Sequence, residues 1–289
     1  MIKFENTEVV GWEAAIRGMR NPMNSWEKSD SGYCNELVAL NREGCDICPI
    51  KDYDPATCYE KNPYIIGPND LDLMKRLRDA GTDHRKFMRM ITVYVDITAP
   101  LYWWKEFDTY KVGTVANSCS TMHKIAAKEF TLEDFSYDHL EDLIGDDDLD
   151  ESLLIDVSCN RDGTNLYSPT GILTIGIKAL NRYRDRYLET KDKKYWWQMI
   201  QLLPSSYNQK RTVMMNYEAL ANIYKSRRNH KLDEWAEHDG INSPLGKITK
   251  KTETERGITL EGVRYFGFCD WIETLPYSEL ITGKFKEDE

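Results

Sequence analysis

The stretch that most constrains the fold is MITVYVDIT, residues 90–98. Its apolar side chains occupy every second position, at Ile91, Val93, Val95 and Ile97. Neighbouring side chains of a strand point to opposite faces, so this alternation predicts a strand with one buried face. Ala99-Pro100 follows directly and predicts a new helix, with Thr98 as its cap. Pro100 suits the first helical turn, where its missing N–H breaks no helical hydrogen bond.

Helical spacing recurs along the rest of the chain. NDLDLMKRLRDAG, residues 69–81, begins with Asn69 as a helix cap and ends with Gly81, a residue typical of helix ends. Four further helices are expected at 170–188, 192–203, about 213–236 and 259–274. Together these patterns predict an α+β fold, with helices packed around a modest, mainly antiparallel sheet.

Composition narrows the class of protein. The net charge of −10 argues against non-specific nucleic-acid binding, which needs clustered Lys and Arg, although a small anionic ligand remains compatible. No apolar run is long enough to span a membrane. The N-terminal MIKFENTEVVGWEAA lacks the basic start and apolar core of a signal peptide. We therefore expect reduced cysteines and a cytoplasmic protein, of a cell or of a virus that infects one.

Two polar segments raise the question of metal binding. Four of the seven cysteines form a C-x10-C-x2-C-x9-C pattern: Cys34, Cys45, Cys48 and Cys58. Zinc sites usually combine two tight pairs, and only Cys45 and Cys48 form one. A structural zinc site and a loop with unrelated thiols both fit. The acidic run 146–151 lacks the glycine and the final glutamate of a calcium loop, so it reads as a solvated loop.

A third polar segment, EFDTYKVGTVANSCSTMH at 106–123, follows the predicted strand and a Trp-Trp pair. Small polar side chains at such a place either bind a ligand or satisfy backbone groups. Cys119 and His123 are four residues apart, which on a helix would place thiol and imidazole on one face. A packed thiol beside a satisfied histidine explains the pair more simply. General nucleotide, metalloprotease and serine-hydrolase motifs are absent from the sequence.

The order of these signals resembles the flavin-dependent thymidylate synthase (ThyX) family. That family has an Ala-Pro-aromatic helix with a Gln, then Arg-His-Arg, Ser, Asn-Glu, Ser and Arg-Tyr at fixed spacing. Placed from Ala99-Pro100 without gaps, its Gln falls on Glu106 and its Arg-His-Arg on Thr109, Tyr110 and Lys111. The remaining positions fall on Thr114, Ala116-Asn117, Cys119 and Thr121-Met122, and an earlier family His falls on Arg89.

A second block, LPSSYNQKRTVMMNYEALANIYKSRRNHKLDEW at 203–235, resembles the family independently. The family places a basic residue after Leu-Pro, and then Asn, Asn and Arg; these fit Lys210 or Arg211, Asn216, Asn222 and Arg227. The resemblance covers roughly 66–130 and 195–235. It implies a single ThyX-like domain over 1–289, with insertions at 22–66 and 140–170.

The resemblance also implies ligands and partners. It implies FAD, a dUMP-type nucleotide and a homotetramer, with NADPH and methylene tetrahydrofolate if the family reaction is retained. Cofactor-binding positions would be Thr109, Tyr110, Lys111, Asn216 and Asn222. Nucleotide-binding positions would be Glu106, Thr114, Asn117, Cys119, Thr121, Lys210, Arg211 and Arg227.

The motif departs from the family where charge matters most. Thr109, Tyr110 and Thr121 are neutral at positions where the family has Arg or His. Each charged hydrogen bond is worth about 1.5–3 kcal/mol, so the family's ligands should bind more weakly unless Lys105, Lys124, Arg85 or Arg89 compensate.

Three hypotheses follow from the resemblance and its departures. The first is a divergent flavin-dependent methyl or hydroxymethyl transferase acting on a pyrimidine nucleotide. The second is a non-catalytic nucleotide-binding protein on the same scaffold. The third is a related enzyme that acts on a different substrate, in which Cys119 or Tyr110 has gained a role.

Overall fold

A computed structural model gives the fold of the chain. It describes residues 2–34, 62–140, 168–236, 248–254, 257–262 and 266–283. The cysteines at 45, 48 and 58 and the acidic run at 146–151 lie outside these residues. No helix in the described part of the chain is long and apolar enough to cross a membrane.

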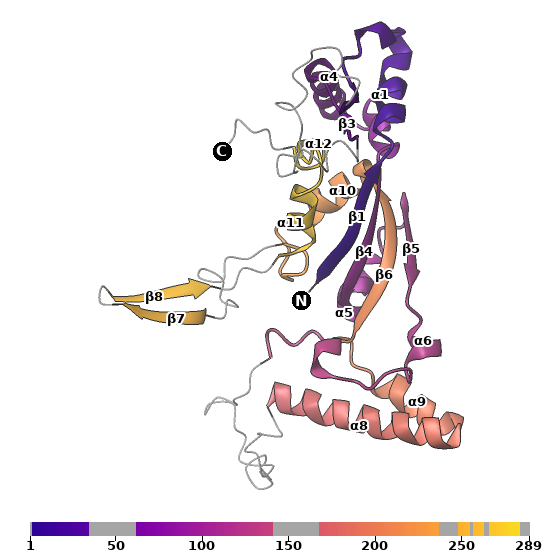
Figure 1. Ribbon diagram of the computed structural model, residues 1–289, viewed down its shortest axis with the longest axis vertical. Coiled ribbons are helices and arrows are strands. Elements are labelled where there is room, and N and C mark those ends of the chain that lie inside the picture. Colours follow the sequence, from indigo (N-terminus) through magenta and orange to yellow (C-terminus); the bar gives the residue numbers. More distant parts are fainter. Residues whose placement is uncertain are drawn as a thin grey trace.

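A four-stranded sheet forms the centre of the molecule (Figure 1). Its strands, in spatial order, are β1 (Lys3–Val10), β4 (Thr92–Pro100), β6 (Asn208–Asn216) and β5 (Thr114–Ser118). Every neighbouring pair is antiparallel. The predicted strand at 90–98 is therefore confirmed as β4, and so is the mainly antiparallel sheet of the α+β fold.

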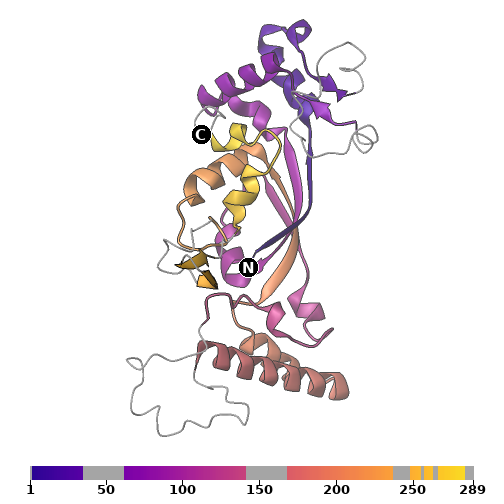
Figure 2. The ribbon, with the colours of Figure 1, turned by 60° about the vertical axis from the view of Figure 1, so that its left-hand side comes forward.

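One face of the sheet is covered by helices. Val93 and Val95 of β4 and Val213 of β6 point to this face and are almost fully buried. The covering helices are α5 (Leu101–Phe107), α10 (Tyr217–Arg227) and α11 (Phe268–Glu273) (Figure 2). Aromatic rings fill the space between them; Trp103, for example, lies 4.7 Å from Trp235 between ring centroids.

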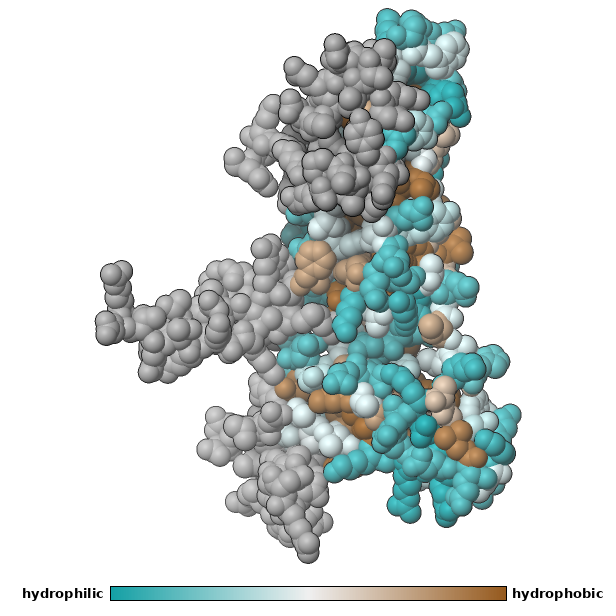
Figure 3. Space-filling view, in the orientation of Figure 1, coloured by the Kyte–Doolittle hydropathy of each residue, from teal (hydrophilic) through white to brown (hydrophobic). Residues whose placement is uncertain are grey.

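The opposite face of the sheet is open. The strand register aligns one residue from each of the four strands on this face: Glu8, Tyr94, Met214 and Val115. Tyr94 is 39% exposed and Val115 is 60% exposed. Over the side of the molecule drawn in Figure 3, hydrophilic residues cover most of the described surface, with apolar patches between them.

Helices also lie at both ends of the sheet. Near one end are α1 (Trp12–Arg20), α4 (Pro68–Asp79) and α12 (Glu279–Thr282), and near the other α8 (Pro169–Thr190) and α9 (Lys193–Leu202) (Figure 1). The short elements are η1 (Asn21–Met23), η2 (Trp26–Lys28), β2 (Gly32–Tyr33), β3 (Tyr64–Ile65), η3 (Arg85–Arg89), α6 (Thr121–Lys124), η4 (Leu132–Asp134), β7 (Ile248–Thr254) and β8 (Gly257–Gly262). The helices predicted at 69–81, 170–188 and 192–203 correspond to α4, α8 and α9.

Two predicted helices and two caps are wrong in part. Asn69 was predicted to cap its helix, but α4 begins at Pro68 with Gly67 at the N-cap position. Residues 208–216 form a strand, so the helix predicted at 213–236 is limited to α10. Pairing with β4 on one side and β5 on the other outweighs the local helical pattern there. The helix predicted at 259–274 is limited to α11, because β8 takes residues 257–262. Thr98 lies within β4, and Pro100 takes the N-cap position of α5.

Candidate functional site

Arg227, the last residue of α10, lies at the centre of a cluster of polar and aromatic side chains. Its Nη1 donates to Oε2 of Glu106 at 2.6 Å, and its Nε donates to the hydroxyl of Tyr110 at 2.7 Å. The exposed fraction is 18% for the Arg227 side chain and 35% for that of Glu106, so both remain reachable from solvent. Three residues predicted from two separate sequence blocks therefore meet in one place.

His230 and Trp235 complete this cluster, and the sequence interpretation missed both as site residues. Trp235 Nε1 donates to Oε2 of Glu106 at 3.2 Å, and His230 Nε2 lies 3.3 Å from the same oxygen. The guanidinium of Arg227 lies 4.8 Å from the centre of the Trp235 ring. Such a cation–π contact holds the planar group in a defined orientation. The sequence feature that could have identified His230 and Trp235 is their position within a few residues of Arg227.

Lys210 and Arg211 point to opposite faces of the sheet, because they are neighbours on β6. Arg211 stacks on Trp104 at 4.1 Å on the helix-covered face and forms a 2.7 Å ion pair with Asp108. Lys210 lies on the open face, 2.9 Å from Glu5 and 3.3 Å from Asp96. Hydrogen bonding to Glu5 raises the pKa of Lys210. Lys210 and Arg211 are the two candidates for the basic residue that the family places after Leu-Pro, and the structure gives them different surroundings.

A cavity of about 380 Å³ lies at the end of the sheet beside α6. Its lining includes three predicted nucleotide-binding residues: Cys119, Thr121 and Lys210. Lys124 and Lys128 add positive charge, although Lys128 forms an ion pair with Asp134. The lining also includes the carboxylates of Glu133 and Asp134, so the cavity combines small polar groups with charges of both signs.

Thr114 and Asn117, the two predicted residues of β5, lie on different faces. Thr114 is aligned with Met215 on the helix-covered face, and its buried hydroxyl has no hydrogen-bond partner among the described residues. Asn117 is aligned with Thr212 and is exposed on the open face. β5 therefore places Thr114 and Asn117 on opposite faces of the sheet.

The predicted cofactor positions mostly make contacts within the chain. Thr109 donates its hydroxyl hydrogen to the backbone oxygen of Glu106 at 2.7 Å, and Tyr110 accepts from Arg227. Asn216 caps α10, because its Oδ1 accepts from the backbone N–H of Ala219 at 2.9 Å. Lys111 is exposed.

Asn222, the remaining predicted cofactor position, borders a group of charged side chains. Its Oδ1 accepts from Nη2 of Arg85 at 3.3 Å. Arg85 and Arg89 both form ion pairs with Glu218, whose residue is only 8% exposed. Burial opposes ionisation of Glu218, but hydrogen bonds from Arg89 and Arg85 outweigh it and lower its pKa. Glu218 was not singled out from the sequence.

The geometry of Cys119 and His123 differs from the helical pair considered above. The helix α6 begins at Thr121, so Cys119 lies outside it. Ser120 caps this helix, and its hydroxyl lies 2.7 Å from Nδ1 of His123. His123 is therefore paired with Ser120 and not with the thiol. Within the described residues, no group of three or more His, Cys, Asp or Glu side chains is placed to hold a metal ion.

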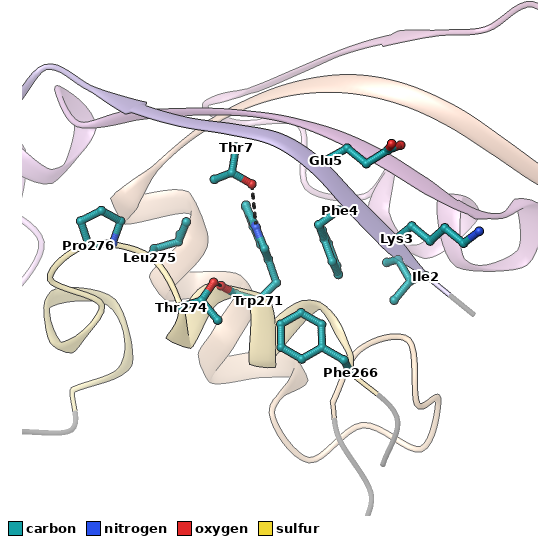
Figure 4. A pocket seen from close by; sticks show the side chains of 10 residues that line it. All are labelled: Ile2, Lys3, Phe4, Glu5, Thr7, Phe266, Trp271, Thr274, Leu275 and Pro276. Carbon is teal, nitrogen blue, oxygen red and sulfur yellow. Dashed lines mark hydrogen bonds between the residues drawn. The ribbon is translucent and has the colours of Figure 1, made fainter. Parts of the chain in front are cut away.

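A second groove, of about 640 Å³, lies between β1 and α11 (Figure 4). Phe4 stacks on Trp271 at 5.1 Å, and Trp271 donates to the Thr7 hydroxyl at 3.1 Å. None of the residues predicted from the sequence to bind ligand lines this groove. The predicted ligand-binding residues instead gather in the Arg227 cluster and in the cavity beside α6.

Comparison with known proteins gives structural similarity alone. No protein-family model matches the chain, and no curated protein matches it in sequence. Thymidylate synthase X (ThyX) from Helicobacter pylori, solved with FAD and dUMP, is 13% identical with a TM-score of 0.46, covering 80% of this chain and 86% of that chain. The UMP/dUMP methylase PolB from Streptomyces cacaoi, bound with 5-Br UMP, is 13% identical with a TM-score of 0.43, covering 81% and 79%.

Proposed function

We propose that this chain is a divergent ThyX-like transferase that binds a pyrimidine nucleoside monophosphate of the dUMP type and transfers a methyl or hydroxymethyl group to it. The observation that carries the proposal is the contact of Arg227 with Glu106 and Tyr110. These residues come from the two separate blocks that resemble the family. Their side chains are half-buried, charged or polar, and open to solvent, as a ligand site requires.

The two ends of the nucleotide would be held by different groups. Arg227 and Glu106 would contact the base, because they present hydrogen-bond donors and acceptors next to aromatic rings. Lys210, Thr121 and Cys119 would face the phosphate in the cavity beside α6. Arg227 lies among the helices on the covered face, whereas Lys210 points to the open face. We therefore propose that another copy of the chain completes each site, within a homotetramer.

The residues fit a nucleotide better than they fit FAD. Thr109, Tyr110 and Asn216 already use their polar atoms within the chain. Lys111 and Asn222 remain exposed for a cofactor, with Arg85 beside Asn222 as a positive charge for a phosphate group. When bound, a flavin would supply redox chemistry and carbon transfer, which the side chains cannot. NADPH and methylene tetrahydrofolate would be needed only if the chain carries out this flavin-dependent transfer.

The same contacts support a second candidate function, a nucleotide-binding protein without catalysis. In that case the Arg227 cluster and the cavity beside α6 would hold the nucleotide, and the neutral Thr109 and Tyr110 would serve only structural roles. This alternative accounts for the loss of charge at the positions that resemble the family's flavin contacts.

Two measurements on the purified full-length chain separate the candidates. A transferase should show flavin absorbance at about 450 nm, either as purified or after FAD is added and the excess removed. Either candidate should be stabilised against heat by pyrimidine nucleoside monophosphates. Stabilisation without flavin uptake would favour the binding protein, and no response to any nucleotide would contradict both.

A further inference from the structure

Two hydrogen bonds within the chain hold the Arg227 side chain in one orientation. Its Nε donates to the Tyr110 hydroxyl at 2.7 Å, and its Nη1 donates to Oε2 of Glu106 at 2.6 Å. Because Nε and Nη1 belong to one rigid, planar group, anchoring both atoms prevents the guanidinium from turning within its plane. The orientation of Arg227 is therefore set in the free chain, before a ligand binds.

Two aromatic rings restrict the same guanidinium further. Its central carbon lies 5.5 Å from the centre of the Tyr110 ring and 4.8 Å from the centre of the Trp235 ring. Cations are attracted to aromatic rings at distances up to about 6 Å. The two rings also contact each other, with 6.1 Å between their centres and an angle of 68° between their planes. Tyr110 therefore contacts Arg227 in two ways, through its hydroxyl and through its ring.

The turn that ends α5 places Tyr110 in this position. The backbone N–H of Tyr110 donates to the carbonyl of Phe107, the last residue of α5, at 3.0 Å. Tyr110 is half-buried and lies 117 positions from Arg227 in the sequence. The resemblance gives position 110 to the cofactor, with a His in the family. In this chain the side chain at that position is instead engaged by the arginine expected to contact the nucleotide.

We propose that Tyr110 is a positioning residue of the nucleotide site, which holds the Arg227 guanidinium in the orientation that binds the pyrimidine. The inference rests on the proposed function, because it requires a nucleotide at the Arg227 cluster. It goes further by assigning Tyr110 to the nucleotide and not to the cofactor. Ordering a long side chain during binding costs affinity, and a side chain that is already ordered avoids this cost. Tyr110 thus strengthens binding without touching the ligand.

The test is a double-mutant cycle on the full-length chain, in which calorimetry measures the dissociation constant of dUMP. Its members are the wild type, Tyr110→Phe, Arg227→Lys and the double variant. Tyr110→Phe keeps the ring and removes the hydroxyl that accepts from Nε. It should raise the dissociation constant about two- to tenfold, the effect of releasing one long side chain. A lysine has no guanidinium to orient, so Tyr110→Phe should have no further effect in the Arg227→Lys background.

Tyr137→Phe is the matched control for the loss of a hydroxyl. Tyr137 is exposed, and its side chain makes no contact among the described residues. This variant should bind dUMP as the wild type does. Binding that is too weak for calorimetry is measured from the rise of the unfolding temperature at high dUMP concentration.

Two results would overturn the inference and leave the proposed function intact. The first is an unchanged dUMP affinity in Tyr110→Phe. The second is an equal loss of affinity in the wild-type and Arg227→Lys backgrounds, because Tyr110 would then act on the ligand directly or on the fold in general. If dUMP does not bind the folded wild-type chain, the proposed function fails together with the inference. If Arg227→Lys does not fold, Tyr110→Phe compared with Tyr137→Phe decides.

Discussion

Arg227 and Glu106 are separated by 121 positions in the sequence, yet Nη1 of Arg227 lies 2.6 Å from Oε2 of Glu106. Arg227 ends the helix that follows β6, and Glu106 lies on the helix that follows β4. Because β4 and β6 are paired antiparallel strands, the helices that follow them start at opposite ends of the sheet. Both helices pack on the covered face, where Glu106 near the end of α5 meets Arg227 at the end of α10. The fold itself thus brings the two charges together.

Replacing Arg227 by Lys should weaken nucleotide binding. The ammonium keeps the charge but loses the planar fork and the stacking on Trp235. The lost charged hydrogen bond is worth about 1.5–3 kcal/mol, so the dissociation constant should rise about ten- to a hundredfold. Calorimetric titration with dCMP and dUMP measures this change.

The control for this variant is Arg228→Lys, one residue further along the chain. Arg228 is exposed and its side chain makes no contact among the described residues. Binding should be unchanged in this control. Wild-type affinity in Arg227→Lys would exclude Arg227 from the ligand site.

Asp70 should be required for stability. It is fully buried and accepts from Arg20 Nε and the Ser29 hydroxyl at 2.7 Å each, and from the Ser31 hydroxyl at 2.6 Å. Asp70→Asn removes the charge and leaves the buried Arg20 unpaired, which should cost about 3–5 kcal/mol of unfolding free energy. Urea denaturation measures this loss. Asp72→Asn, at an exposed ion pair with Arg76, should cost less than about 1 kcal/mol.

Asp70 should also make stability depend on pH. Burial raises its pKa, but hydrogen bonds from Ser31, Ser29 and Arg20 outweigh burial and lower it below 3.8. A carboxyl whose pKa is lower in the folded state stabilises the protein fully above its unfolded pKa. This contribution is lost as the pH falls from about 4 through the folded pKa. Asp70→Asn should therefore lose less stability than wild type over that acid range, and parallel curves would contradict this assignment.

Cys119 and Cys269 should differ strongly in reactivity. Cys119 is exposed, whereas Cys269 is 4% exposed and its burial raises its pKa to about 12. Thiolate is the reactive form, so a thiol reagent at pH 8 should label Cys119 readily and Cys269 only after unfolding. Peptide mapping by mass spectrometry distinguishes them from the other cysteines. Equal labelling of both in the native chain would contradict the burial of Cys269.

Asn216 should act first as a helix cap. Asn216→Ala removes the acceptor for the Ala219 N–H and should cost about 0.5–2 kcal/mol, while Asn216→Asp keeps an acceptor and should cost little. Thermal or urea unfolding measures both. Asn222→Ala, at an exposed position of the same helix, should change stability only slightly. A loss of flavin uptake in Asn216→Asp, with stability unchanged, would show that Asn216 also contacts a cofactor.

Local patterns were sufficient where a single element buries one face. The alternation at 90–98 predicted β4, because Val93 and Val95 face the core while Tyr94 and Asp96 do not. The helices α4, α8 and α9 carry periodic apolar residues within their own sequence, and α8 and α9 are capped by the side chains of Ser168 and Asp192. Such signals lie within a few residues of one another, so the sequence alone contains them.

Patterns failed where pairing partners decide the structure. VMMN at 213–216 fits a helix by itself, but β4 and β5 flank it and make it a strand. Lys210 and Arg211 are equivalent along the sequence, and only the sheet assigns them to opposite faces. His230 and Trp235 belong to the Arg227 cluster only through their contacts with Glu106, a residue more than a hundred positions away.

The sequence by itself determined the strand β4, most of the helices, the acidic charge balance and the order of polar positions that resembles the ThyX family. These depend on spacing between near neighbours, which residue types alone reveal. The tertiary structure decided that Arg227, Tyr110 and Glu106 form one cluster and that Cys119, Thr121 and Lys210 line the cavity beside α6. Antiparallel strand pairing brings distant segments together, and short-range sequence patterns do not show which strands will pair.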